Sequence, residues 1–334
     1  MTRLLIVRMS ALGDIVHALP VLSAIRGAWP AVEIDWLADE RYAGVLDLVE
    51  GITHRIVVRP GYLKALSIMR ARRYDAALDL QGLIKSASAA WLSGATRVIG
   101  FETSVLRESS AAWFYSEAVP VAAGAHIIQK NLSVLPALGI ERPSKPQFPF
   151  VLPASAAADQ VATDAASRGS GRFVLINAGA AWPNKRWPPD RFGELAHRIQ
   201  KEHTLPSYVL WGRGEESLAD AVVSASRGAA VRAPETSLGD LLTLSSRAAL
   251  MISGDTGPIH FAAAMQTPVV GLYGPTWPER NGPWDPDDVV VSRASECVCH
   301  HKRQCQRGVM CLDAVTVDEV ASAVARRLSQ ARPS

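Results

Sequence analysis

The sequence predicts an α/β protein built from two doubly wound domains, each with a mostly parallel sheet. Its 334 residues are enough for about two domains of ordinary size. Short apolar runs alternate with helical patterns in both halves of the chain. A Pro-rich and then Ala/Ser-rich stretch over 141–171 lies between the halves. We therefore expect an N-terminal domain over 1–150, a linker and helix over 151–171, and a C-terminal domain over 172–334.

In the first half, the expected strands are Leu4–Arg8, Glu33–Leu37, Arg55–Val58, Ala76–Leu80 and Arg97–Phe101. Apolar residues at helical spacing from Ile15 to Ile25 predict a helix after the first strand, which Pro20 kinks or delays. A second helix is expected over Lys64–Arg73. The turn at Gly13–Asp14 lies between strand and helix, which is the usual place for a ligand.

In the second half, the expected strands are Phe173–Asn177, Ser207–Trp211, Ala249–Ser253 and Pro268–Tyr273. The expected helices are Ala156–Ala166, Pro189–Lys201, Ala219–Ala225, Leu238–Ala248, Pro258–Met265 and Val317–Leu328. Ser237 and Asp240 form a capping box at the start of one of them. Two such domains suggest a ligand in the cleft between them, although the fold alone names no reaction.

Composition excludes several classes of protein. No run of 18 apolar residues exists, so a transmembrane helix is not expected, and Arg8 and Asp14 interrupt any signal-peptide core. We therefore expect a cytoplasmic protein. The net charge of +3 is too small to create an electrostatic field over the whole protein that would attract nucleic acid. Four Cys are too few for a disulfide scaffold.

Two polar segments suit chemistry at strand ends, and each has a plainer interpretation. Asp14 is either a helix-start charge stabilised by the helix dipole or a general base facing the cleft. Small residues followed by Lys185 and Arg186, before a helix, suit a diphosphate; the alternative is an ordinary loop with solvated cations. No GxGxxG turn is present, which argues against a nucleotide-linked oxidoreductase.

The third segment, Ser253–His260, carries the strongest signal. It joins a strand to a helix with Pro258 in its first turn, and it combines two Gly, a hydroxyl and an acid in a small polar nest. A plain tight turn is the alternative.

Together these segments resemble the signatures of bacterial heptosyltransferases, glycosyltransferase family 9. The resemblance is carried by Arg8–Pro20, Lys185–Pro188 and Gly254–Thr276, and it covers residues 3 to about 280. Leu80–Ser86 and Arg107–Tyr115 most resemble heptosyltransferase I. The resemblance implies a GT-B enzyme, in which two Rossmann-like domains face a central cleft.

The implied reaction is inverting transfer of heptose from ADP-heptose to Kdo in the lipopolysaccharide inner core. A heptosyltransferase II or III activity, with heptose or another sugar as acceptor, is the alternative. No cofactor and no nucleic acid are implied as partners. We expect a monomer that associates peripherally with the inner face of the cytoplasmic membrane.

Site residues follow from the resemblance position by position. Asp14 matches the catalytic base, and Lys185 matches the Lys on the diphosphate. The expected ADP-heptose contacts are Gly179, Ala180, Ala181, Lys185, Glu215, Asp255, Thr256, Gly257 and His260, with Glu216 as an alternative to Glu215. The expected acceptor contacts are Ser10, Gly13, Arg59, Lys64, Gln81, Lys85 and Arg107. Ala180 and Ala181 stand where heptosyltransferase I often has hydroxyl residues, so backbone groups would replace two side-chain contacts.

Two features remain open. Cys297, Cys299, Cys305 and Cys311 could hold a structural metal, or they could be reduced thiols or a disulfide. A metal-stabilised nucleic-acid module is the corresponding non-enzymatic hypothesis, and the near-neutral charge opposes it. The basic stretch from Arg55 to Arg73 is either a solvated helix face or a cationic rim that steers an anionic lipid.

Overall fold

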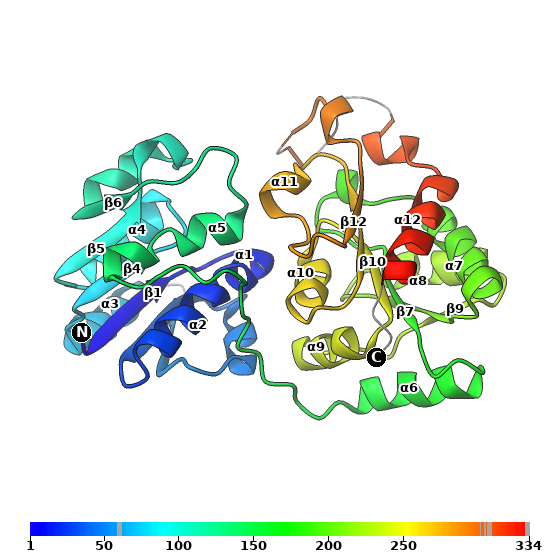
Figure 1. The fold of residues 1–334 in the computed structure, drawn as a ribbon, viewed down its shortest axis with the longest axis horizontal. Coiled ribbons are helices and arrows are strands. Elements are labelled where there is room, and N and C mark those ends of the chain that lie inside the picture. Colours follow the sequence, from blue (N-terminus) through cyan, green and yellow to red (C-terminus); the bar gives the residue numbers. More distant parts are fainter. Residues whose placement is uncertain (59–61, 301, 304, 306–308, 331–334) are drawn as a thin grey trace. The chain divides into compact units, whose positions relative to one another are not determined.

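The computed structural model describes the chain except for residues 59–61, 301, 304, 306–308 and 331–334. It divides into two compact units, Met1–Val151 and Leu152–Ser334. Each unit contains a six-stranded parallel sheet with helices packed on both faces (Figure 1). The predicted pair of doubly wound α/β domains is therefore confirmed.

The sheet of the first unit has the order β3-β2-β1-β4-β5-β6. Its strands are β1 Arg3–Val7, β2 Glu33–Asp39, β3 His54–Val58, β4 Ala76–Asp79, β5 Arg97–Phe101 and β6 Glu117–Val119. Its helices are α1 Leu12–Val16, α2 Leu19–Ala28, α3 Leu63–Arg72, α4 Ile84–Leu92 and α5 Ile127–Leu132. The direction of strand addition reverses between β1 and β4, where Leu4 pairs with Ala76. A ligand crevice is expected beyond the carboxyl ends of these two strands.

The second unit repeats this topology with the order β12-β11-β10-β7-β8-β9. Its strands are β7 Val174–Asn177, β8 Ser207–Leu210, β9 Ala230–Arg232, β10 Leu250–Gly254, β11 Val269–Tyr273 and β12 Val289–Ser292. Its helices are α6 Ala156–Ser167, α7 Pro189–His203, α8 Glu216–Ala225, α9 Leu238–Arg247, α10 Gly257–Ala264, α11 Pro278–Asn281 and α12 Val317–Gln330. The reversal lies between β7 and β10, where Asn177 pairs with Ser253.

The sequence prediction missed the least periodic elements. The helix expected from Ile15 onward is two helices, and Pro20 is the second residue of α2, where its lack of an N–H breaks no helical bond. The strands β6 and β9 have only three residues each and lie at sheet edges. Helix α4 is rich in Ala and Ser, so its apolar period is weak.

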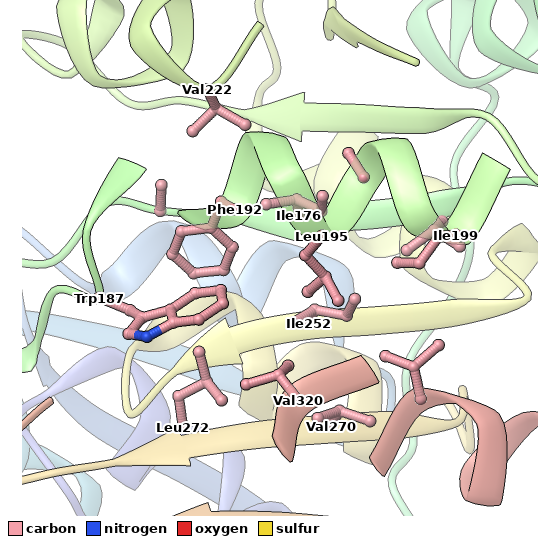
Figure 2. Packing of buried hydrophobic residues seen from close by; sticks show 14 of the residues in the cluster. Ile176, Trp187, Phe192, Leu195, Ile199, Val222, Ile252, Val270, Leu272 and Val320 are labelled. Atoms are coloured by element: carbon pink, nitrogen blue, oxygen red, sulfur yellow. The ribbon is translucent and has the colours of Figure 1, made fainter. Parts of the chain in front are cut away.

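An aromatic pair in the second unit anchors helix α7 and the loop before it in the core. The rings of Trp187 and Phe192 meet edge to face with centroids 4.8 Å apart, against apolar residues of β10, β11 and α12 (Figure 2). The Trp187 indole N–H donates to the carbonyl of Val315 at 2.9 Å. Because Trp187 follows Lys185 by two residues, this packing fixes the end of the loop that carries Lys185.

The first unit fixes its β1 loop in a similar way. Trp36 of β2 is fully buried, and its indole N–H donates to the carbonyl of Arg8 at 3.1 Å. The backbone N–H of Asp39 donates to the carbonyl of Met9 at 3.1 Å. The chain therefore leaves β1 along a defined path toward Asp14.

Two helical glycines provide a test of this packing. A Cβ added at Gly193 in α7 would lie 2.5 Å from the Ala225 Cβ and 2.6 Å from the Val222 carbonyl oxygen, whereas one added at Gly27 in α2 meets nothing within 4 Å. Gly193→Ala should lower the free energy of unfolding by about 1–3 kcal/mol. Gly27→Ala should raise it by about 0.5–1 kcal/mol, because Ala loses less backbone entropy in a helix. Urea unfolding of both variants measures the contrast, and equal destabilisation would contradict the α7–α8 packing.

Candidate active site

Polar residues gather at the carboxyl ends of the strands on both sides of each reversal. In the second unit they follow β7 and β10, and in the first unit they follow β1 and β4. These are the positions at which doubly wound sheets bind ligands. Each unit is therefore described separately, from its strand ends outward.

In the second unit, Lys185 and Asp255 form a close ion pair. The Lys185 Nζ lies 2.5 Å from Asp255 Oδ2 and also donates to the Asp255 carbonyl at 3.2 Å. The Lys185 side chain is 16% exposed and that of Asp255 is 5% exposed. The ammonium group lies 4.8 Å from the centre of the Trp182 ring, which is a cation–π distance. The more exposed partner, Lys185, is thus held in one orientation with access to solvent.

Two further side chains complete the surroundings of the Asp255 carboxylate. Asn281 of α11 donates to Oδ1 at 2.8 Å, and His260 Nε2 lies 3.5 Å from the same oxygen. Burial by itself raises the pKa of Asp255, but the His260 hydrogen bond and the Lys185 charge outweigh it and hold this pKa well below its usual range. Asp255 is therefore a carboxylate at neutral pH.

The backbone around this pair comes unusually close to its neighbours. A Cβ on Gly254 would lie 2.7 Å from the carbonyl oxygen of Lys185, and one on Gly179 would lie 2.2 Å from the Glu215 carboxylate. The contact at Gly254 is with backbone and excludes a side chain there, whereas at Gly179 the Glu215 side chain would have to move aside. The Glu215 carboxylate also accepts the N–H of Gly212 at 3.1 Å. Between the two candidates for this position, the structure places Glu215 beside the loop that follows β7.

The hydroxyl of Thr256 does not cap α10. It accepts from the Asn177 side-chain amide at 2.9 Å and lies 3.2 Å from the Ser253 hydroxyl. The N–H groups of Thr256 and Gly257 lie at the start of α10. Among the described residues, no side chain accepts a hydrogen bond from them. Such N–H groups at a helix start attract anions.

The two alanines differ in their environments. Ala180 is buried and its carbonyl accepts two hydrogen bonds from the Arg186 guanidinium, at 2.9 Å and 2.6 Å. Ala181 is exposed. Arg186 therefore serves to hold the loop, whereas Lys185 points its charge toward Asp255.

Asn281 and Asn177 were absent from the predicted site. Asn281 carries no sequence signal, because it is 26 residues from Asp255, the residue it contacts.

In the first unit, Arg8 and Asp14 form the corresponding pair. The Arg8 Nη2 lies 2.7 Å from Asp14 Oδ1, with side-chain exposures of 6% and 35%. Arg8 also donates to the carbonyl of Leu80, which ties the β1 loop to the β4 loop. Asp14 Oδ2 accepts the N–H of Ala11 at 3.1 Å, so the carboxylate also caps α1. Each carboxylate oxygen has a second lone pair, so capping leaves an acceptor on the exposed side.

A buried acid organises the neighbouring loop. Asp79 ends β4 with no exposure, and burial raises its pKa despite hydrogen bonds from Tyr115 at 2.7 Å and Ser86 at 3.0 Å. It also accepts the N–H groups of Gln81 and Gly82. The Gln81 side chain in turn accepts the N–H of Met9 at 2.8 Å. This network places Gln81 beside the loop that carries Asp14.

The other predicted acceptor residues spread over a wider surface. Ser10 and Gly13 lie between β1 and Asp14, and Lys85 at the start of α4 lies 5.1 Å from the ring centre of Tyr62. Lys64 and Arg107 are exposed and, within the described residues, form no hydrogen bond or ion pair with any of these groups. Arg59 lies outside the described residues.

The cysteine segment packs behind the Lys185 turn. Cys297 and Cys299 are buried free thiols with sulfur atoms 3.4 Å apart. The Asn184 amide donates to Cys299 Sγ at 3.6 Å and to the Lys302 carbonyl at 2.8 Å. Across the residues that the structure describes, which leave out His301, no three His, Cys, Asp or Glu side chains are arranged to hold a metal. A structural metal stays an untested prediction.

Comparison with known proteins identifies the family. The family model described as "Glycosyltransferase family 9 (heptosyltransferase)" matches residues 63–310. The chain belongs to glycosyltransferase family 9. The predicted glycosyltransferase activity is thereby confirmed, and the strand ends described above are the candidate active site of this enzyme.

Several relatives carry the name lipopolysaccharide heptosyltransferase 1. The one from Pseudomonas aeruginosa is 29% identical over 323 residues, which cover 91% of this chain and 87% of the relative. The one from Escherichia coli K12 is 25% identical and covers 88% of this chain and 94% of the relative. Lipopolysaccharide heptosyltransferase 3 from Escherichia coli K12 is 23% identical over 96% of this chain and 97% of the relative.

Solved structures confirm the GT-B architecture. The E. coli heptosyltransferase WaaC with ADP has a TM-score of 0.76 at 22% identity and covers 98% of this chain and 100% of that one. The E. coli ADP-heptose lps heptosyltransferase II has a TM-score of 0.75 at 20% identity, with 99% of both chains covered. No helix in the described part of this chain is long and apolar enough to span a bilayer.

The Asp255 pair predicts a specific response to acid. The folded-state pKa of Asp255 lies below the ordinary value of 3.8, so its stabilisation is complete above about pH 4 and is lost as the pH falls further. The melting temperature of wild type should therefore fall more steeply below about pH 4 than that of Asp255→Asn. The exposed Asp287→Asn is the control and should keep the wild-type acid profile. Parallel profiles of wild type and Asp255→Asn would contradict the pairing.

The cysteine segment yields a second prediction. Cys297→Ser with Cys299→Ser should lower the melting temperature and leave turnover per folded molecule nearly unchanged, because sugar transfer needs no thiolate. The half-buried Cys305→Ser is the control and should change the melting temperature less. Elemental analysis without a metal-affinity step tests for a bound metal. A folded double variant that has lost turnover would show that the segment acts in catalysis.

Proposed function

We propose that this enzyme transfers heptose, with inversion, from ADP-heptose to Kdo in the inner core of lipopolysaccharide. The proposal rests on one observation: the two points where the sheets reverse direction present different chemical groups. The second unit presents a cation and uncapped N–H groups, which suit a diphosphate. The first unit presents a half-exposed carboxylate, which suits deprotonation of a hydroxyl.

Departure of ADP places negative charge on the diphosphate as the bond to the sugar breaks. The Lys185 ammonium and the N–H groups of Thr256 and Gly257 are placed to stabilise that charge. Asp255 contributes by orienting Lys185, since the carboxylate is buried and its oxygens are already occupied. The chain's own groups supply the positive charge, so we propose a reaction that needs no cofactor.

The attacking hydroxyl of the acceptor loses its proton to Asp14. Arg8 holds this carboxylate from the buried side at 2.7 Å, which leaves the exposed side toward the acceptor. One base and one leaving group on opposite sides of the sugar give a single displacement, as in inverting glycosidases. Ser10, Gly13 and Gln81 lie on the same edge and are the proposed inner acceptor contacts.

The acceptor assignment rests on the relatives. Several named heptosyltransferase 1 are 25–29% identical to this chain, and those named heptosyltransferase 3 are 23–25% identical. A heptosyltransferase II or III activity is the second candidate, supported by the relatives named heptosyltransferase 3. We further propose that the enzyme works as a monomer at the cytoplasmic face of the inner membrane, where its lipid acceptor lies.

A donor–acceptor assay tests this assignment. Purified enzyme is given ADP-heptose with a heptose-free Kdo-bearing acceptor and, separately, with a heptose-bearing one. The proposal predicts transfer to the heptose-free acceptor. Transfer only to the heptose-bearing acceptor would establish the second candidate, and transfer to neither would refute both.

Asp14→Asn should reduce turnover by about 10²–10⁴-fold at saturating donor, the usual contribution of a positioned base. Asp190→Asn is the matched control, because Asp190 is also a first-turn helical acid but lies exposed in α7. The control should keep wild-type turnover. Near-normal turnover of a folded Asp14→Asn variant would leave Asp14 with only its capping role.

Lys185→Gln should lower kcat more than it raises the donor KM, because the contact strengthens as charge develops on the diphosphate. The variant also leaves Asp255 buried without its cation, which destabilises the fold. Lys185→Gln with Asp255→Asn should therefore regain thermal stability without regaining kcat. A change confined to KM would assign Lys185 to uniform donor binding, and recovery of kcat in the double variant would show a structural role.

A further inference from the structure

Helices α3 and α4 and the short helix Ser109–Phe114 carry large apolar side chains that the first unit leaves exposed. Trp113 is 83% exposed, Leu63 81% and Trp91 57%. Ile68 and Ile84 are each 43% exposed. Apart from Met1 and Val151 at its two ends, the described residues of this unit expose no other large apolar side chain to this degree. We call these five residues the α3–α4 face.

The elements that carry these side chains adjoin one another. Helices α3 and α4 contact each other, and the Arg70 guanidinium of α3 donates to the Leu92 carbonyl at the end of α4 at 3.0 Å. The Trp91 and Phe114 rings lie 6.1 Å apart, which joins α4 to the short helix Ser109–Phe114 that carries Trp113. Along α4, Ile84 and Trp91 are seven residues apart and so point the same way.

The same surface is positively charged. Lys64, Arg70, Arg73, Lys85 and Arg107 are all exposed, and none forms an ion pair with another described residue. Among the nearby acids, Asp75 accepts backbone N–H groups of Thr2 and Arg3, whereas Glu108 accepts the N–H of Ile84 and so adds one negative charge to this surface. Asp39 interacts electrostatically with Lys85. The five cations outnumber Glu108 and Asp39, so the face combines indole rings with a net positive charge.

We infer that the α3–α4 face binds an anionic lipid bilayer, with Trp91 and Trp113 entering the interface and the cations meeting lipid phosphates. Indole rings favour the membrane–water interface, and each surface cation adds electrostatic attraction to anionic lipid. A second copy of the chain fits less well, because pairing this face with itself would bring like charges together.

The location agrees with the proposed function, on which this part of the inference rests. Helices α3 and α4 begin just after β3 and β4, so Leu63 and Ile84 lie at the carboxyl edge of the sheet. The proposed acceptor contacts Gln81 and Lys85 lie at the same edge. With a bilayer against this face, a lipid-anchored acceptor could reach that edge of the sheet while it stays in the membrane.

Vesicle co-sedimentation tests the inference with the full chain and no acceptor present. Wild type should bind vesicles of phosphatidylcholine with phosphatidylglycerol, bind phosphatidylcholine alone weakly, and lose binding as salt is raised. Trp91→Ala with Trp113→Ala should weaken binding by about tenfold. Arg70→Gln with Arg73→Gln should weaken it by about fivefold per charge. Circular dichroism confirms that each variant is folded.

Leu152→Ser and Lys201→Gln, which change an exposed apolar residue and an exposed cation in the second unit, are the matched controls. Both should bind like wild type. Asp14→Asn should also bind like wild type while losing turnover, which separates this inference from the proposed reaction. Wild-type binding by the Trp double variant would overturn the inference. So would a concentration-dependent dimer in sedimentation equilibrium that the Trp substitutions abolish, since a second copy would then be the occupant.

Discussion

The buried ion pair between Lys185 and Asp255 is the interaction on which the proposed donor site depends. Burying two charges is costly, so such a pair adds little stability compared with apolar residues in its place, yet losing one partner alone destabilises the fold. Asn281 and His260 complete the carboxylate, and Trp187 packs the end of the Lys185 turn into the core. The arrangement leaves Lys185, the more exposed partner at 16%, as the group that can meet a ligand.

The first unit contains a similar ion pair in which the roles of cation and acid are exchanged. There the buried partner is the cation, Arg8, at 6% exposure, and the accessible partner is the acid, Asp14, at 35%. In both units the pair lies where the sheet reverses direction, because only there do adjacent strand ends diverge to leave a crevice. The same fold thus presents an accessible cation at one reversal and an accessible carboxylate at the other. The difference lies in which member of each ion pair is more deeply buried.

The sequence predicted nine of the twelve described strands and the loops that follow them, because apolar runs and glycine-rich turns are local signals, but it missed β6, β9 and β12. It placed Asp14, Lys185 and Asp255 at strand ends for the same reason. It could not predict Asn281 or Arg8 as their partners, since a contact between distant residues leaves no pattern in a single sequence. The short edge strands β6 and β9 were missed because three residues carry no measurable period.

Hydrogen exchange of the full chain with and without ADP tests the central claim most directly, because it reports where the nucleotide binds without relying on turnover. The account predicts that ADP slows exchange in the loops at 178–186 and 254–257, around Lys185 and Asp255. It predicts no change at 8–14, the loop of Asp14. Slowed exchange at 8–14 with none at 178–186 would contradict the assignment of the donor to the second unit.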